Sequence, residues 1–298
     1  MQRIASLTVA ASLLLLGAPL LAAAVKLTSG TEIRLELQQN ITAAYTPADT
    51  PIYFRVADDV LAERAVAIRK GTLVRGRMES ATDRGMVGTS GTMTFGIHFV
   101  TAVDGQKIHV IANTTRAGRD RGNALVGWTI AWGVFGLMTK GVNPYFERGA
   151  TFDVQVLADK RVDTEKPIAS DDQALPLAAH QVQFLRYKVA DSSSKPFKLD
   201  IERGGKLKTI EFQLQWPAEL GAAQPSLATL ELVAVAGAPV PERQSALSAT
   251  AKSVTFDSWS ILQYCRDGVS ELRFRGTTPA GEAFDVTYPL EIKIVKKK

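Results

Sequence analysis

Short runs of alternating apolar and polar residues constrain the fold of this chain more than any other feature. Ile33, Leu35 and Leu37 alternate with charged residues, and the same two-residue period recurs at 152–157 and 210–216. This period is typical of strands with one buried face, and glycine- or proline-containing turns separate the runs at near-regular spacing. The sequence therefore predicts an all-β fold: an N-terminal β-barrel or sandwich followed by a C-terminal antiparallel β-sandwich.

A stretch rich in charges and small residues divides these strands into two groups. Residues 160–180 contain two prolines and have the composition of a linker. We therefore expect a first domain over 25–159 and a second over 181–298. The strongest hairpin turn is Asp104-Gly105, and a helix is expected only around 259–264.

The N-terminus has the pattern of an export signal. Met1-Gln2-Arg3 supplies a positive charge, a leucine-rich apolar stretch follows, and Ala22-Ala23-Ala24 offers the small residues that signal peptidase recognises. We expect residues 1–24 to be a signal peptide cleaved before Val25. An uncleaved membrane anchor is the alternative, because Ile4 to Val25 carries no charge. No cysteine follows the apolar run, so a lipoprotein signal is excluded. We expect a periplasmic protein, with outer-membrane association as a second option.

Composition argues against most metal and redox chemistry. Cys265 is the only cysteine, which excludes an intrachain disulfide and a cysteine zinc cluster. It follows Tyr264 in an apolar stretch, so we expect a core residue and not a nucleophile. His98 and His109 flank the predicted hairpin, but two imidazoles without a third ligand favour surface positions over a metal site.

The sequence also lacks the common catalytic motifs. It contains no Gly-x-Ser-x-Gly, no His-Glu-x-x-His and no phosphate-binding glycine loop. Asp58-Asp59 is expected on a strand, where neighbouring side chains point to opposite faces and cannot serve one substrate. Asp171-Asp172 is expected in the solvated linker, and 202–206 reads as a turn. We therefore expect a non-catalytic protein with no metal and no cofactor.

The charge of the chain points away from nucleic acid. The formal net charge is only +5, and basic residues are interleaved with acidic ones. A nucleic-acid binder would show a concentrated basic stripe with stacking aromatic residues. We expect no nucleic-acid partner.

Residues 123–139 break the strand pattern because all 17 of them are uncharged. The segment is long for one strand and short for a membrane-spanning helix, and its glycines weaken a helix by about 1 kcal/mol each. Three interpretations are open: a core hairpin or buried helix that caps the barrel, an apolar arm that enters a membrane or joins equivalent arms, and a lid over an apolar pocket. The residues predicted to contact a membrane or partner are Trp128, Ile130, Trp132, Val134, Phe135 and Leu137.

Five short blocks of the sequence occur in the order found in a known protein family. They are Leu27–Ile33, Phe54–Val60, Ala67–Thr72, Asp104–Ile108 and Phe146–Phe152. Through them, residues 27–159 resemble the C-terminal barrel domain of TrbI-like proteins, the scaffold subunits of conjugation and type IV secretion channels. The resemblance implies a β-barrel with the uncharged segment inserted between the last two blocks. In TrbI-like channels that insertion is a helical antenna that enters the outer membrane.

Together these features predict an exported, non-catalytic envelope protein. It would be a structural or interaction scaffold that uses the apolar insertion to contact a membrane or an oligomer. Its partner would be another envelope protein, a second copy of the chain or the outer membrane. Arg69 replaces a proline of the family, and a signal-like segment stands in place of the family's cytoplasmic region, so we expect a stand-alone protein and not a channel subunit. The alternative is a periplasmic carrier in which Trp128, Trp132 and Phe135 line an apolar pocket for a lipid or glycan.

Overall fold

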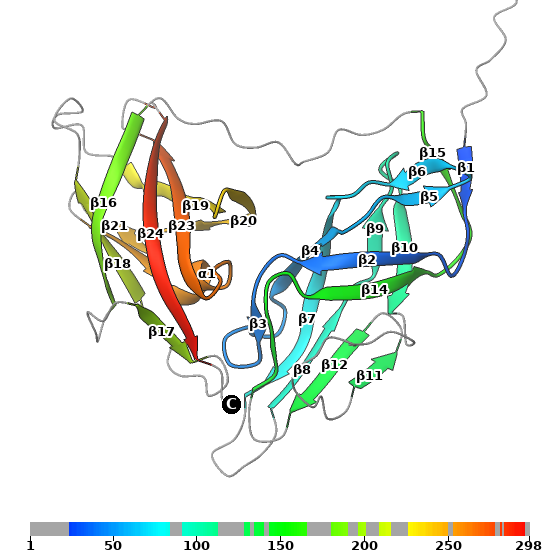
Figure 1. The fold of residues 1–298 in the computed structure, drawn as a ribbon, viewed down its shortest axis with the longest axis horizontal. Helices are drawn as coiled ribbons and strands as arrows, with labels where there is room; N and C mark the ends of the chain where they lie inside the picture. Colours follow the sequence, from blue (N-terminus) through cyan, green and yellow to red (C-terminus); the bar gives the residue numbers. More distant parts are fainter. Residues whose placement is uncertain are drawn as a thin grey trace, which may run out of the picture.

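The computed structural model describes residues 24–83, 91–112, 128–131, 134–139, 143–165, 180–189, 196–200, 209–215, 226–249, 253–277, 281 and 283–295. Within these ranges every regular element is a strand apart from one short helix, α1 (Ser258–Leu262), which confirms the all-β fold class. The strands form two units, each with its own cluster of buried apolar residues. The units lie side by side along the long axis of the molecule (Figure 1).

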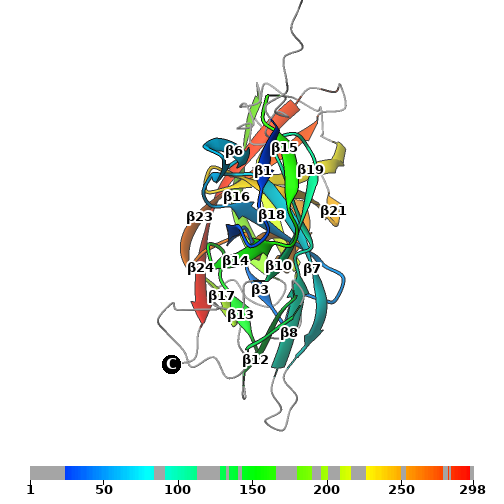
Figure 2. The same cartoon turned by 90° about the vertical axis from the view of Figure 1, so that its right-hand side faces the viewer.

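A nine-stranded antiparallel sheet forms the N-terminal unit. Its strands are β2 (Glu32–Leu37), β4 (Pro51–Val56), β7 (Leu73–Thr82), β8 (Gly91–Gly96), β9 (Phe99–Thr101), β10 (Lys107–Ala112), β11 (Trp128–Ala131), β12 (Val134–Thr139) and β14 (Thr151–Val156). Their order in the sheet is β11-β12-β8-β7-β4-β2-β14-β10-β9. Contacts of β7 with β9, and of β10 with β11 and β12, show that the sheet curls back on itself (Figures 1 and 2).

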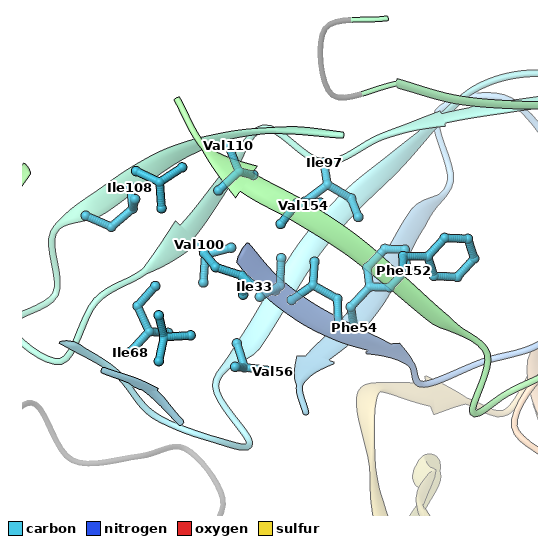
Figure 3. Close-up of a cluster of buried hydrophobic side chains, with 14 of the residues drawn as sticks. Ile33, Phe54, Val56, Ile68, Ile97, Val100, Ile108, Val110, Phe152 and Val154 are labelled. Carbon is cyan, nitrogen blue, oxygen red and sulfur yellow. The ribbon is translucent and has the colours of Figure 1, made fainter. Parts of the chain in front are cut away.

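The alternation in the sequence explains the core of this unit. Ile33, Leu35 and Leu37 of β2 are fully buried, whereas the charged residues between them are exposed or half-buried. The curled sheet turns such side chains from several strands toward one another, among them Phe54, Phe152 and their aliphatic neighbours (Figure 3). Burying one face of each strand is therefore what holds this unit together.

Three small two-stranded sheets complete the N-terminal unit. They pair β1 (Ala24–Leu27) with β15 (Lys160–Asp163), β3 (Ile41–Thr42) with β13 (Tyr145–Phe146), and β5 (Val60–Ala62) with β6 (Ala65–Ile68). The first pairing moves the boundary expected from the sequence. Residues 160–163, which were assigned to the linker, form a strand of the N-terminal unit because β1 supplies a hydrogen-bonding partner.

The C-terminal unit is a second nine-stranded sheet. It consists of β16 (His180–Val189), β17 (Phe197–Asp200), β18 (Thr209–Gln215), β19 (Ser226–Val235), β20 (Ala238–Ser245), β21 (Ser248–Ala249), β22 (Ser253–Asp257), β23 (Gly268–Thr277) and β24 (Ala283–Val295). The order is β20-β19-β23-β24-β16-β18-β22-β21, with β17 also on β24. Two pairings depart from the antiparallel pattern, because β16 and β17 both run parallel to β24. The terminal strands β20 and β21 are consecutive in the chain, so residues 238–249 link the two edges of the sheet.

The short helix α1 forms where the sequence predicted one. The Asp257 carboxylate caps it by accepting a 3.0 Å hydrogen bond from the Ser260 amide. Trp259 and Leu262 are buried in the C-terminal core. Tyr45 of the N-terminal unit belongs to the same core, and its ring centroid lies 5.1 Å from that of Trp259. The two units therefore share a packed junction at α1.

Candidate interaction site

The uncharged segment contains a β-hairpin made of β11 and β12. Trp128 pairs with Leu137 and Ala131 with Val134, so the strands are antiparallel and in register. All six residues of β12 then pair with β8, from Val134 with Gly96 to Thr139 with Gly91. The hairpin thus extends the main sheet of the N-terminal unit, and its backbone is bound to β8 over the full length of β12.

Phe135 holds this hairpin on the N-terminal core. Its side chain is only 3% exposed. The ring stacks on Phe95 and meets Phe152 edge to face, with both pairs of ring centroids 5.3 Å apart. Phe135 is therefore a core residue of the isolated chain, which differs from the membrane or partner contact expected from the sequence. Sequence alone gave no reason to separate it from its apolar neighbours.

For the other five predicted contact residues, the structure describes the backbone of four and no side chain. Trp128 and Ile130 lie on β11, and Val134 and Leu137 lie on β12, so their backbone positions are established. Their side chains and the whole of Trp132 lie outside the described part of the structure. The structure thus brings four of them together on one hairpin beside β8.

Close packing of β7 against β8 supports the strand on which the hairpin lies. A Cβ atom at Gly76 would lie 2.7 Å from the Gly96 carbonyl oxygen and 3.1 Å from the Phe54 ring. Real Cβ atoms do not approach backbone oxygen this closely, so glycine is required at position 76. This glycine lets β8 sit tightly on β7 and present its other edge to β12.

The histidines and acidic pairs considered in the sequence form no metal-binding cluster among the residues described. His98 and His109 are exposed beside the β9–β10 hairpin, and no three His, Cys, Asp or Glu side chains converge in the described ranges. Asp58 and Asp59 lie in the loop between β4 and β5 and not on a strand, and the Asp59 carboxylate accepts a 2.7 Å hydrogen bond from the Lys70 amide. Residues 171–172 and 202–206 lie outside the described residues.

Cys265 is a buried core residue, as predicted. It is 1% exposed, and its burial raises the pKa of the thiol to about 12. Because the nucleophile is the thiolate, this thiol is unreactive at neutral pH. The finding supports the core interpretation of the Tyr264-Cys265 stretch, although these residues follow α1 and do not lie on a strand.

A buried ion cluster in the C-terminal unit was missed by the sequence analysis. Asp285 on β24 is fully buried and accepts hydrogen bonds from Arg273 at 2.7 Å and from Arg275 at 2.9 Å, both on β23. The two arginines flank the core residue Phe274 and therefore point away from the apolar core. The signal available in the sequence was a strand with two arginines two positions apart, followed by a strand that contains an aspartate. Since guanidinium groups bind both carboxylate oxygens, the cluster serves to join β23 to β24.

The chain matches no protein-family model, and no curated protein matches it. In the part of the chain that the structure describes, no helix is long and apolar enough to cross a membrane.

Proposed function

We propose that this chain is an exported, non-catalytic envelope protein that uses the β11–β12 hairpin to contact a membrane or an equivalent hairpin. The observation that carries the proposal is the position of β11. It is a terminal strand of the N-terminal sheet, and within the described ranges it pairs only with β12. Its sequence, Trp128–Ala131, contains no charge and no proline.

Edge strands that stay in water are normally protected by charges or prolines, since their unpaired backbone groups promote association. One terminal strand of the C-terminal sheet, β20, follows that rule. It contains Pro239, Pro241, Glu242 and Arg243. The contrast between β20 and β11 favours a contact function for β11, because β20 carries charges and prolines and the described β11 residues carry neither. β11 approaches β10 where the sheet curls, but within the described ranges the two strands are not paired.

The N-terminus and the family resemblance support the envelope part of the proposal. β1 begins at Ala24, and Val25, the first residue after the expected cleavage point, is buried against β15. Cleavage there would leave the strand almost intact. The uncharged segment also follows β10 and precedes β13 and β14, which is the place of the membrane antenna in the TrbI-like proteins that residues 27–159 resemble.

The proposal is tested by vesicle flotation and light scattering of the chain without residues 1–24. We expect it to float with vesicles of phosphatidylethanolamine and phosphatidylglycerol, or to form an oligomer. The double substitution Trp128→Lys with Trp132→Lys should abolish both behaviours, because charge is costly in an apolar contact. Deleting 123–139 is the poorer experiment, since it also removes the core residue Phe135.

A matched control comes from leucines exposed elsewhere. Leu61 and Leu247 are 59% and 64% exposed, so Leu61→Lys with Leu247→Lys adds the same charge away from the hairpin. This variant should behave like the unmodified chain. If the unmodified chain is monomeric by light scattering and does not float with vesicles, the contact function is refuted. Lipid or glycan that copurifies with that monomer, detected by mass spectrometry, would support the carrier alternative. Unfolding of the tryptophan variant, seen by circular dichroism, would instead show that the indoles belong to the core.

A further inference from the structure

We infer that the two β-units act as one rigid body because Asn40 and Arg148 of the N-terminal unit bind the C-terminal turn of α1 in the other. We call this contact the latch. The last carbonyl groups of any helix lack partners within the helix and must find them elsewhere. Here the Leu262 carbonyl accepts from the Cys265 amide, and each carbonyl of the turn at 262–265 also accepts a hydrogen bond from the other unit of the chain.

Asn40 is the centre of the latch. It is 1% exposed, and its side-chain Nδ2 donates hydrogen bonds to the carbonyl oxygens of Cys265 at 2.7 Å and Leu262 at 3.2 Å. Its Oδ1 accepts from the Arg148 amide at 2.9 Å and the Tyr145 hydroxyl at 3.3 Å. One amide thus uses its donors on the C-terminal unit and its acceptor on the N-terminal unit. This division fits asparagine and excludes aspartate, which has no donor.

Arg148 and the backbone of Asn40 bind the carbonyls that remain. Arg148 donates from Nη1 to the Tyr264 carbonyl at 2.8 Å, and the Asn40 amide donates to the Gln263 carbonyl. Burial and the nearby Arg266 lower the pKa of the Arg148 guanidinium, yet it stays charged at physiological pH. Four consecutive carbonyls, 262–265, therefore have donors from the N-terminal unit, which is a specific match and not a chance contact.

Contacts outside this turn prevent rotation about it. The Tyr45 ring packs on Trp259, and the Tyr45 hydroxyl donates to the Asp200 carbonyl at 3.2 Å. The Tyr53 hydroxyl on β4 donates to Glu242 on β20 at 2.9 Å. Because these contacts involve β4, β20 and the last residue of β17, the units are joined at several elements and cannot pivot about α1 alone.

The latch is tested by pulsed electron spin resonance on the full chain with spin labels on Leu61→Cys and Leu247→Cys. These sites lie on different units and are exposed, whereas Cys265 is buried and stays unlabelled. We expect one narrow distance distribution. The isosteric change Asn40→Asp should broaden it, because a carboxylate would then face the carbonyls of Leu262 and Cys265.

Gln38→Glu is the matched control, since it makes the same amide-to-carboxylate change two residues away. The Gln38 side chain donates only to the Glu36 carbonyl in its own unit, so the distribution should stay narrow. Arg148→Met is the milder second variant if Asn40→Asp fails to fold by circular dichroism, and it should also broaden the distribution. A broad distribution in the unmodified chain, or a narrow one in a folded latch variant, would overturn the inference. The spin-label distances do not depend on vesicle binding. The latch and the proposed function can therefore be refuted independently of each other.

Discussion

Phe135→Ala tests whether the hairpin is part of the N-terminal core. The ring is 3% exposed and contacts the Phe95 and Phe152 rings, each at 5.3 Å between centroids. Truncating a buried phenylalanine removes its transfer free energy and leaves a cavity, which costs about 3–5 kcal/mol. The two ring pairs account for about 0.5–1.5 kcal/mol each within that loss. We therefore expect the free energy of unfolding to fall by about 3–5 kcal/mol.

The assay is urea unfolding followed by circular dichroism, in which the m value must stay constant for the comparison to hold. Phe135→Leu is the control, because it keeps most of the volume and loses mainly the ring pairs, about 1–3 kcal/mol together. A loss below about 1 kcal/mol for Phe135→Ala would match a surface substitution. That outcome would refute the docking of the hairpin on β8 and favour an arm that projects from the sheet.

Two further predictions concern the C-terminal unit. Gly276→Ala should destabilise the protein by about 1–3 kcal/mol, because its Cβ would lie 2.5 Å from the Phe284 ring, its partner across β23 and β24. In the Phe284→Leu background, Gly276→Ala should lower the free energy of unfolding, measured by urea unfolding, much less than it does in the unmodified chain. If the effects of the two substitutions simply add in this double-mutant cycle, the clash is contradicted. Cys265 has a folded-state pKa raised by burial from 9.0 to about 12, so its contribution to stability is complete below pH 9 and is lost as the pH rises toward 12. Between these values stability should fall up to about 1.4 kcal/mol per pH unit more steeply than in Cys265→Ala, and equal slopes in the two proteins would contradict the assignment.

The junction shows why the candidate sites were only partly predictable. Gln39 and Asn40 are buried, yet in the sequence they are two polar residues between strands, which usually indicates a solvated loop. The backbone carbonyls that the Asn40 side chain binds lie more than 220 positions away along the chain. A side chain that binds backbone atoms leaves no pattern in the sequence of its partner, since every residue has a carbonyl. The latch therefore had no signal that could be read in advance.

The amino-acid sequence by itself determined the local structure of this protein. Alternation established the all-β class and the inward faces of strands such as β2, while the apolar neighbourhood of Cys265 indicated its burial. These properties depend on residues close together in the chain. The tertiary structure alone decided that β1 pairs with β15, that β16 runs parallel to β24, and that the uncharged hairpin lies on β8 with Phe135 in the core. Strand pairing joins backbone groups that are the same in every residue, so the partner is selected by how the whole chain can bury its apolar faces at once.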